Sequence, residues 1–503
     1  MRAKVLMIQG TTSNAGKSAM VTGLCKTLVN FGLNVAPFKP QNMSLNSAVT
    51  LDGKEIGRAQ ALQAMACGIE PHSDMNPVLL KPSSDTGSQV IVQGKVYEAM
   101  IDASSYHNLK AKLIPYVLES FYNLAQKYDV IIVEGAGSPA EINLAQNDLA
   151  NMGFAKQVNC PVIIVSDIER GGVFAHLYGT WALLTKNEKK LVKGFIINKF
   201  RGDKQLLNTG IDYLYQQTNI PLIGIMPYIN NLQLQAEDSL SHELPNNLTS
   251  KHNKFKITIL KIPYISNETD FEPLFLCPNL EVSYAQSAEL FPKSDLIIIP
   301  GSKNVREALK FIIKNSWDTE IFRHLRYGGK LIGICGGLQI LGKVIHDPWG
   351  IEGDRGSSQG LGLLELETTI TKNKQLKLVE GYLAYNKAFV RGYEIHMGVS
   401  TGNALVNPAI ISQNQKEGAV SKDNLILGTY LHGLFDENSS LQAIMQWAGL
   451  NNLSHFDYKS NTRNEINKIA ANMECNLDML QLMEILNSSK LNFPINKSKK
   501  MSV

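Results

Sequence analysis

The 503-residue sequence lacks the features that define several large classes of protein. Its six cysteines include no C-x-x-C pair, which argues against a disulfide framework or a zinc knuckle. No apolar run approaches the ~20 residues that span a bilayer. A strand pattern begins so close to the first residue that no room is left for a signal peptide. The net charge of +4 is too small to indicate nucleic-acid binding. We therefore expect a cytoplasmic protein without membrane or nucleic-acid partners.

Length and apolar patterning predict more than one α/β domain. The chain is longer than one hydrophobic core usually serves. In its first half, short apolar runs alternate with polar, glycine-containing segments and helical patterns, which is typical of a doubly wound, mainly parallel sheet with ligands at the carboxyl ends of its strands. The runs that we interpret as strands cover residues 5–9, 34–38, 129–133, 161–165, 192–197 and 221–226.

A glycine-rich loop follows the first of these strands and precedes a predicted helix from 17 to 31. Strand, loop, Lys-Ser and helix together predict a phosphate loop that binds ATP and Mg²⁺. Its backbone N–H groups would hold phosphate oxygens, Lys17 would reach the β- and γ-phosphates, and the Ser18 hydroxyl would bind Mg²⁺. Five residues, not four, separate the two glycines, as in the loop of dethiobiotin synthetase-type enzymes. The loop residues are Gly10, Thr11, Thr12, Ser13, Asn14, Ala15, Gly16, Lys17 and Ser18.

Three further polar residues at or after predicted strands are candidates for the same nucleotide site. Glu134 could bind Mg²⁺ directly or through water, or it could cap the next turn. Lys39 could contact a phosphate or a substrate carboxylate, or it could be a solvated surface lysine. Asn198 carries a donor and an acceptor that suit the adenine edge, although asparagine is also a common turn residue.

The second half contains a candidate cysteine nucleophile. Residues 231–254 show no sustained periodicity and are interpreted as a linker, after which strand patterns restart at Phe255. The apolar run 331–334 leads into Gly333-Ile-Cys335-Gly-Gly337, the spacing of a nucleophile elbow with Cys in place of Ser. A thiolate at this position can be activated by the helix that follows and by a histidine.

Two other predicted strands of this half end in residues that complete such a site. The run 425–431 precedes His432, the candidate base, and the run 295–300 precedes Gly301. The backbone around Gly301 and the N–H of Gly336 are the candidate oxyanion donors. An isolated cysteine, histidine or glycine would be unremarkable in a turn, but three at successive strand ends favour a catalytic site.

With these residues, the second half resembles a class I glutamine amidotransferase domain, and the whole chain resembles the cobyric acid synthase family. The motifs that carry the resemblance are the Gly10–Ser18 loop, Lys39-Pro-Gln-Asn-Met-Ser44, Glu134-Gly-Ala-Gly137, Asn198-Lys-Phe-Arg-Gly-Asp203, Pro300-Gly-Ser-Lys-Asn304, Gly333-Ile-Cys335-Gly-Gly-Leu-Gln339, Gly392-Tyr-Glu-Ile-His-Met-Gly398 and Tyr430-Leu-His432-Gly-Leu-Phe435.

The resemblance implies an ATP-dependent ligase of cobalamin biosynthesis that takes ammonia from glutamine. Its corrinoid substrate would be adenosylcobyrinic acid a,c-diamide, amidated at the b, d, e and g carboxylates to give adenosylcobyric acid. We expect a synthetase domain over residues 1–230, the linker 231–254, an amidotransferase domain over 255–445, and a helical extension with a polar tail over 446–503. We expect the helical stretch from about 440 to 486 to pack against the amidotransferase domain.

The sequence departs from these families at two places. Many class I glutaminases carry a Glu two residues after the histidine, where this chain has Leu434, so the resemblance implies a Cys–His pair without the usual third member. Dethiobiotin synthetase-like sites carry an additional metal carboxylate in the stretch comparable to 57–66, where Gln60 is the nearest in type. Glu394 and His396 lie in a family motif, and a structural pair or a corrinoid contact is as reasonable as catalysis.

Two alternative functions are considered. Cobyrinate a,c-diamide synthase has the same domains and chemistry, but that family usually lacks the run 39–44. A P-loop nucleotide switch with a degenerate amidotransferase domain belongs to another class. Such switches usually carry an additional lysine where this chain has Thr11 and Thr12, and the presence of both Cys335 and His432 argues against degeneracy.

Overall fold

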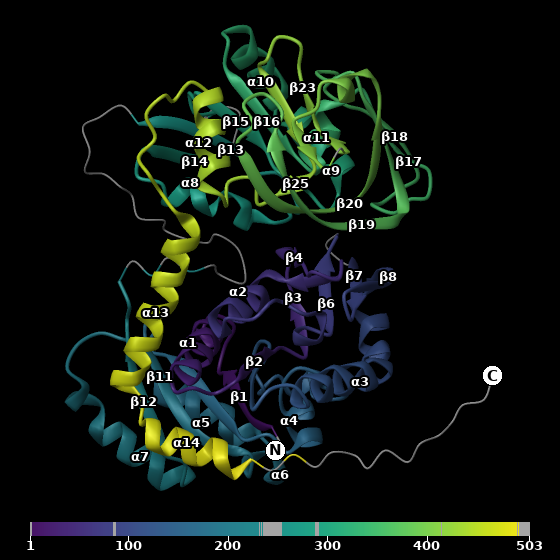
Figure 1. Ribbon diagram of the computed structural model, residues 1–503. Coiled ribbons are helices and arrows are strands. Elements are labelled where there is room, and N and C mark those ends of the chain that lie inside the picture. The colour runs from purple at the N-terminus through teal and green to yellow at the C-terminus, as the bar shows by residue number, and fades with distance from the viewer. Residues whose placement is uncertain are drawn as a thin grey trace.

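The computed structural model describes residues 3–83, 87–230, 232, 234, 254–286, 291–413, 415–489 and 491. It shows two lobes, one built from the N-terminal half of the chain and one from residues after 254 (Figure 1). Most of the predicted linker 231–254, and the predicted tail beyond 491, lie outside the described residues. Within the described ranges, each helix is too short or too polar to cross a membrane.

The first lobe is organised around a parallel six-stranded sheet in the order β12-β11-β10-β1-β9-β2. This confirms the predicted doubly wound α/β fold. The strands are continuous apolar runs because helices cover both faces of the sheet, so neither face meets water. The strands of this sheet are β1 (Lys4–Gly10), β2 (Val35–Phe38), β9 (Val130–Glu134), β10 (Val162–Asp167), β11 (Val192–Phe200) and β12 (Leu222–Pro227).

The register of the sheet brings its carboxyl ends together at one edge. Ile8 pairs with Glu134, Gly10 pairs with Val165, and Asp167 pairs with Asn198. The predicted phosphate loop therefore begins at the same edge that carries Glu134 and Asn198. The helices of this lobe are α1 (Lys17–Asn30), α2 (Arg58–Cys67), α3 (Ala103–Ala125), α4 (Met152–Val158), α5 (Val173–Leu183), α6 (Lys186–Lys189) and α7 (Asn208–Thr218).

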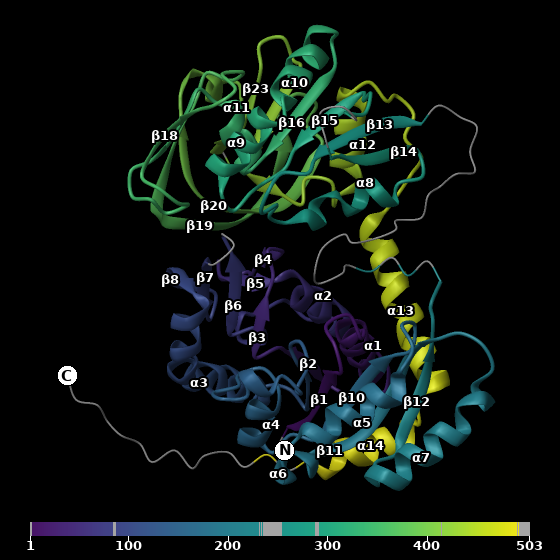
Figure 2. The same cartoon turned by 180° about the vertical axis from the view of Figure 1, so that it is seen from behind.

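Two small sheets lie between β2 and α3 along the chain and face the second lobe (Figure 2). The larger has the strand order β3-β6-β7-β8, and the smaller is the antiparallel pair β4-β5. Their strands are β3 (Gln41–Met43), β4 (Ser47–Val49), β5 (Glu55–Gly57), β6 (Val78–Pro82), β7 (Gly87–Val92) and β8 (Lys95–Asp102).

The second lobe has a central sheet in the order β14-β13-β15-β16-β24-β23, parallel except for β23. Beside it lies a second sheet with the path β18-β17-β19-β20-β25, from which β21 and β22 branch. The strands are β13 (Phe255–Leu260), β14 (Leu280–Ala285), β15 (Leu296–Ile299), β16 (Lys330–Ile334), β17 (Val344–Asp347), β18 (Gly356–Gln359), β19 (Glu367–Leu383), β20 (Phe389–Thr401), β21 (Ile410–Ser412), β22 (Gln415–Glu417), β23 (Ala419–Val420), β24 (Ile426–Thr429) and β25 (Leu431–His432). The helices are α8 (Glu272–Leu276), α9 (Val305–Lys314), α10 (Trp317–Arg326), α11 (Gly336–Leu341) and α12 (Asn438–Trp447).

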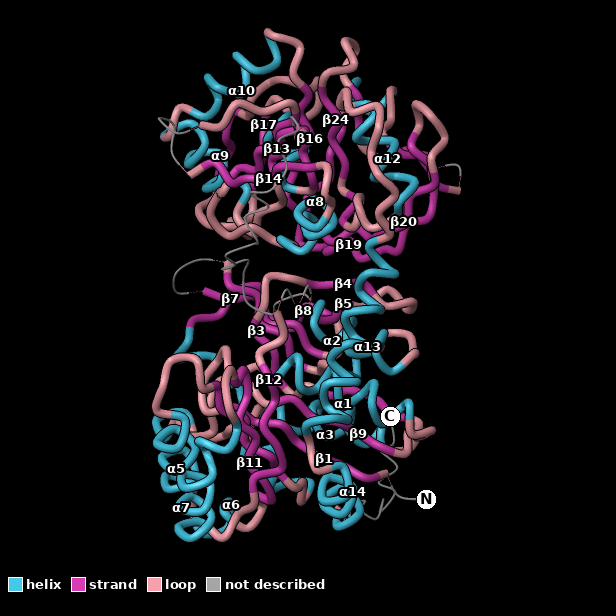
Figure 3. Tube along the Cα trace, turned by 90° about the vertical axis from the view of Figure 1, so that its left-hand side faces the viewer, coloured by secondary structure: helices cyan, strands magenta, loops and turns pink. Residues whose placement is uncertain are grey.

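The predicted packing of the C-terminal helices is wrong for two of the three. α12 joins the core of the second lobe, but α13 (Tyr458–Asn476) and α14 (Met479–Ser488) cross to the first lobe (Figure 3). There, Ile469 and Met473 of α13 and Leu482 of α14 share one buried core with Leu24 of α1. They cover a face of the first sheet that would otherwise expose apolar side chains, which is the physical reason for the crossing.

The lobes contact one another through buried polar groups as well as through α13. The Arg58 guanidinium donates to Asp436 at 3.1 Å, and both side chains are mostly buried. The Ser47 amide donates to Asn267 Oδ1 at 2.8 Å. The contacts therefore join β4 and α2 of the first lobe to loops of the second.

Candidate functional site

Cys335 lies in a tight turn between β16 and α11. Its φ is +53° and its ψ is −106°, a strained conformation for a residue with a side chain. A Cβ added at Gly333 would lie 2.5 Å from Leu341 Cδ1, and one at Gly337 would lie 2.1 Å from the Ile299 carbonyl oxygen. The two glycines of the elbow are thus required by close packing around the nucleophile, as the spacing predicts.

The structure brings Cys335, His432 and Gly301 together. A Cβ added at Gly301 would lie 3.5 Å from Cys335 Cβ and 3.5 Å from His432 Cε1, so the glycine sits between the two side chains. His432 ends β25, which pairs with Tyr393 of β20, and the Tyr393 and His432 rings stack with their centroids 5.5 Å apart. The three predicted residues share one site because their strands end at the same edge of the lobe.

Asp270 is the third member that sequence reasoning missed. It lies in a short 3₁₀ helix, η4 (Glu268–Phe271), where its Oδ2 accepts a hydrogen bond from His432 Nδ1 at 2.6 Å. Its Oδ1 accepts the Gly433 amide at 3.0 Å, which fixes the carboxylate in place. Leu434, at the position where a Glu was expected, is a buried apolar core residue. The usual Glu is therefore absent, as the sequence indicates, and Asp270 is the group that orients His432.

The electrostatics of this triad favour a charged histidine. Burial acts to lower the pKa of His432, but the Asp270 carboxylate and the Cys335 thiol outweigh it and raise that pKa to about 10. Asp270 and His432 side chains are 3% and 1% exposed, so water screens their attraction little. An imidazolium beside Cys335 stabilises the thiolate, which is the nucleophilic form.

Two backbone amides are placed to hold a developing oxyanion. Ser302 forms an isolated antiparallel bridge with Ile265, while the flanking Gly301 and Lys303 make the hydrogen bonds to that segment. The Ser302 N–H consequently points away from Ile265. A Cβ added at Gly336 would lie 3.0 Å from the Ser302 nitrogen, so this amide lies beside the first residue of α11. The Ser302 and Gly336 amides form the donor pair that best fits the geometry.

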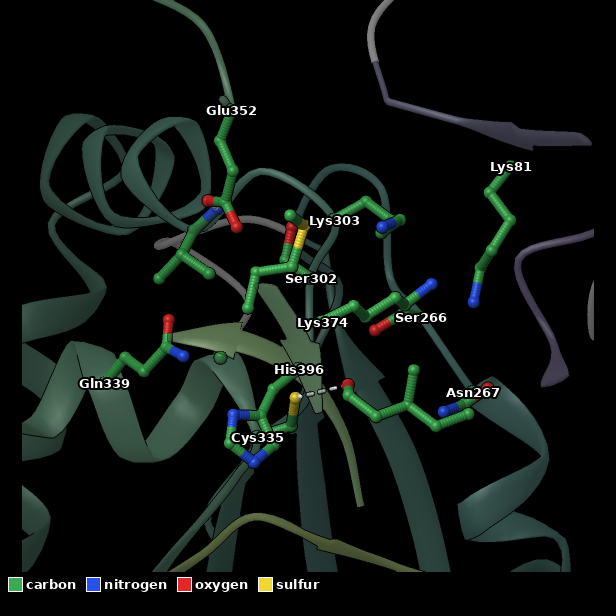
Figure 4. A pocket seen from close by; sticks show the side chains of 14 residues that line it. Lys81, Ser266, Asn267, Ser302, Lys303, Cys335, Gln339, Glu352, Lys374 and His396 are labelled. Atoms are coloured by element: carbon green, nitrogen blue, oxygen red, sulfur yellow. Dashed lines mark hydrogen bonds between the residues drawn. The ribbon is translucent and has the colours of Figure 1, made fainter. Parts of the chain in front are cut away.

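A pocket opens beside Cys335. Figure 4 shows the Cys335 thiol at its base, where the thiol contacts the Ile395 carbonyl oxygen at 3.6 Å. Gln339 also lines it. Its Nε2 donates to the Tyr430 hydroxyl at 3.3 Å, whereas its buried Oε1 has no hydrogen-bond partner among the described residues. An unsatisfied buried acceptor fits a pocket that receives the donor groups of a ligand.

His396 lines the same pocket, with Glu394 behind it. The His396 ring stacks on Tyr430 at 3.8 Å between centroids, and its Nδ1 contacts the Gly398 carbonyl oxygen at 2.7 Å. Its Nε2 lies 3.5 Å from Glu394. These contacts place His396 in the lining of the pocket and Glu394 next to it.

The predicted phosphate loop connects β1 to α1 at the edge of the first sheet. Gly16 has a φ of +95° and begins α1, and no side chain among the described residues caps that end. Asn198 Nδ2 donates to the Ala15 carbonyl at 2.9 Å, so its amide group holds the loop. Lys17 Nζ donates to the Thr12 carbonyl at 3.0 Å across the loop. An uncapped helix start with a lysine folded over it suits phosphate oxygens.

Glu134 lies at the centre of a buried polar cluster beside this loop. Its Oε1 accepts from Ser18 Oγ at 2.7 Å and from Lys39 Nζ at 3.0 Å, and its Oε2 accepts from Gln63. Burial acts to raise the pKa of Glu134, but Lys39 and these hydrogen bonds hold it below its usual value. Gln63, not the Gln60 considered from the sequence, is the amide that contacts this carboxylate.

The oxygen atoms of this cluster are of the kind that binds a magnesium ion. A serine hydroxyl next to a carboxylate offers the hard oxygens that Mg²⁺ prefers. Within the described residues, no group of three His, Cys, Asp or Glu side chains converges on one point, so the remaining ligands would be water and phosphate. Lys39 contacts the same oxygen, so it must shift if a cation binds Glu134 Oε1.

Comparisons with known proteins assign a domain type to each half of the chain. Residues 6–241 match the model of the CobQ/CobB/MinD/ParA nucleotide binding domain. Residues 256–440 match the model of the CobB/CobQ-like glutamine amidotransferase domain. The chain therefore carries a P-loop nucleotide-binding domain followed by a glutamine amidotransferase domain.

Two solved structures share parts of the chain at low similarity. The structure of PurLQS from Thermotoga maritima is 16% identical, with 44% of this chain and 100% of that chain covered at a TM-score of 0.29. A structure titled as a glutamine amidotransferase is 17% identical, with 38% of this chain and 98% of that chain covered at a TM-score of 0.31. Neither likeness is strong enough to bear on function.

Proposed function

We propose that this protein is a glutamine-dependent amide ligase that converts adenosylcobyrinic acid a,c-diamide to adenosylcobyric acid by amidating its b, d, e and g carboxylates. The observation that carries the proposal is the Cys335–His432–Asp270 triad, which opens into a pocket at the boundary with a P-loop domain. A glutaminase joined to a nucleotide-binding domain suits a reaction that needs both ammonia and an activated acid. The order of the motifs along the chain supports the corrinoid as substrate.

The second lobe releases ammonia in two steps. The Cys335 thiolate attacks the side-chain amide carbon of glutamine, and the Ser302 and Gly336 amides hold the oxyanion of the tetrahedral intermediate. His432 gives its proton to the departing nitrogen, so ammonia leaves and a thioester remains. His432 then takes a proton from water, which hydrolyses the thioester to glutamate. Asp270 keeps the imidazole in the required orientation throughout.

The first lobe activates the acid that receives this ammonia. Ammonia does not displace hydroxide from a carboxylate in water, because hydroxide is a poor leaving group. Transfer of the γ-phosphoryl group of ATP to a corrinoid carboxylate gives an acyl phosphate, and ammonia then displaces phosphate to form the amide. Lys17 and the N–H groups at the start of α1 would hold the phosphates. Mg²⁺, held by Ser18 and Glu134, would neutralise charge on the transferred group.

A Cys335→Ala variant tests whether the second lobe releases the ammonia that the first lobe uses. We expect it to lose synthesis from glutamine and to keep synthesis from high concentrations of ammonia. The assay is incubation with the a,c-diamide and MgATP, with either ¹⁵N-amide glutamine or ammonia, followed by intact mass of the corrinoid. Cys475→Ala is the matched control, because Cys475 is an exposed cysteine outside the site. Loss of both reactions in Cys335→Ala but not in the control would contradict the proposal.

The same mass spectra separate the two rival functions. A cobyrinate a,c-diamide synthase would add two amides to cobyrinic acid and none to the a,c-diamide. A nucleotide switch would hydrolyse no glutamine, and its ATP turnover would respond only to a protein partner. Addition of four amides to the a,c-diamide is the result we expect.

A further inference from the structure

Three lysines from two lobes converge at the mouth of the Cys335 pocket. Lys81 comes from β6 of the first lobe, Lys303 from the loop after β15, and Lys374 from β19. Figure 4 shows their amino groups directed toward a common region, with Lys81 arriving from a separate part of the chain. Lys81 is 1% exposed and the Lys374 side chain is 4% exposed. We call these three residues the lysine cluster.

The lysine cluster has more amino groups than carboxylate partners, and burial together with Lys303 and Lys81 lowers the pKa of Lys374 well below its usual value. Glu55 accepts from Lys81 at 2.8 Å and also from Lys374. Lys303 donates to the neutral Gln89 Oε1 at 3.1 Å, and Lys374 donates to the same oxygen at 2.9 Å. One carboxylate thus serves two of the lysines, while the third contacts an uncharged amide.

The nearest additional carboxylate, Glu352, compensates only in part. It lines the pocket and accepts the Val305 amide at 2.8 Å. Burial raises the pKa of Glu352 to about 7, which weakens it as a counter-ion near neutral pH. Burial and the neighbouring Lys81 lower the pKa of Lys303 to about 8, although Glu55 and Glu352 act to raise it. An anion that entered here would relieve this repulsion.

We propose that the lysine cluster binds the α-carboxylate of glutamine, so that Lys81 of the first lobe completes the substrate pocket of the second. This inference rests on the proposed function, which makes glutamine the ligand of this pocket. The α-carboxylate is the one anionic group of glutamine at neutral pH. It lies roughly 5 Å from the side-chain amide carbon along an extended chain. The cluster and Cys335 line one pocket, so a single glutamine can reach both.

Two consequences follow for specificity and for the coupling of the lobes. Amides that lack an α-carboxylate should be poor substrates, because they leave the lysine cluster unneutralised. Glutamine should also bind best when the lobes are docked, since Lys81 and its partner Glu55 belong to the first lobe. Glutamine binding would then draw the two lobes together at the point where ammonia is released.

The test compares glutamine with glutaminamide, whose carboxylate is replaced by an uncharged amide, on wild type and on Lys303→Met. A hydrogen bond to a charged group is worth roughly 1.5–3 kcal/mol, so we expect KM for glutamine to rise about 10- to 100-fold in the variant. Its kcat for glutamine and its ammonia-dependent synthesis should change little. The wild-type preference for glutamine over glutaminamide should be lost in Lys303→Met.

Lys343→Met is the control, because Lys343 is an exposed lysine of the same lobe that pairs with Glu365 on the surface. It should behave as wild type. Lys81→Met should raise KM for glutamine in the same way. That result would show that the first lobe contributes to the pocket. An unchanged preference for glutamine in Lys303→Met, with wild type active on glutamine, would overturn the subsite alone. A wild type that hydrolyses no glutamine would overturn the subsite together with the proposed function.

Discussion

Replacing Asp270 by Asn tests the triad most directly. The substitution keeps the size of the side chain and one oxygen that can accept the Gly433 amide, which bonds Oδ1 at 3.0 Å. It removes the negative charge that faces His432 Nδ1 at 2.6 Å. The asparagine NH₂ group would face Nδ1 and favour the histidine tautomer with its proton on Nε2, where it blocks abstraction of a proton.

The expected loss follows from the burial of the pair. Unit charges about 4 Å apart attract by about 4 kcal/mol at an effective dielectric constant near 20. Removal of this attraction leaves Cys335 alone to oppose burial, so the pKa of His432 falls from about 10 and the imidazolium is disfavoured. A loss of this size corresponds to about a 10³-fold decrease in glutamine hydrolysis.

The assay measures kcat/KM for glutamine hydrolysis and, separately, amidation of the corrinoid with ammonia. Asp270→Asn should lose the first and keep the second, because the ammonia-dependent reaction does not use the triad. Asp354→Asn, at an exposed position of the same lobe, is the control. A decrease of less than about tenfold would refute the reasoning, since 10-fold is only about 1.4 kcal/mol and a buried charge partner must be worth more.

Three other predictions address the first lobe, the packing of α13 and the lysine cluster. Lys17→Met should abolish amidation with either nitrogen source but leave glutamine hydrolysis measurable; normal ammonia-dependent product by mass spectrometry would count against the phosphate loop. Gly23→Ala should lower the melting temperature, because its Cβ would lie 2.4 Å from Ile469 Cγ2 and 2.6 Å from Met473 Cε. Such overpacking costs about 1–3 kcal/mol of stability. Calorimetry measures the transition, and an unchanged melting temperature would argue against the α1–α13 contact. KM for glutamine should rise as pH passes above about 8, since Lys303 then loses the proton that attracts the carboxylate, and Lys303→Met should not show this rise.

The strand-loop-helix units were predictable because burial on both faces leaves continuous apolar runs in the sequence. Parallel strands also place their carboxyl ends on one edge, so motifs that follow different strands can be expected to meet. Gly10, Glu134 and Asn198 were therefore expected at one edge, and Gly301, Cys335 and His432 at another. In both lobes the structure places these residues together.

Asp270 could not be predicted in the same way. It precedes His432 by 162 residues and lies in a 3₁₀ helix with no repeating pattern, so its position depends on how one loop packs against another. The packing of α13 and α14 raises a similar difficulty. Their spacing of apolar residues shows that one face is buried but does not say which lobe covers it. The sequence also does not show which glutamine of α2 faces Glu134, and the structure places Gln63 there.

The crossing of α13 and α14 makes the first lobe depend on residues that are synthesised after the second lobe. The Val5 amide donates to Ser489 Oγ at 3.0 Å, so a hydrogen bond joins β1 to the residue that follows α14. A nascent chain emerges from the ribosome amino terminus first. This face of the nucleotide-binding lobe therefore stays exposed to solvent until α13 and α14 have been made. Truncation before residue 458 would leave the amidotransferase lobe intact. It would expose an apolar face of the first lobe, which would then tend to aggregate.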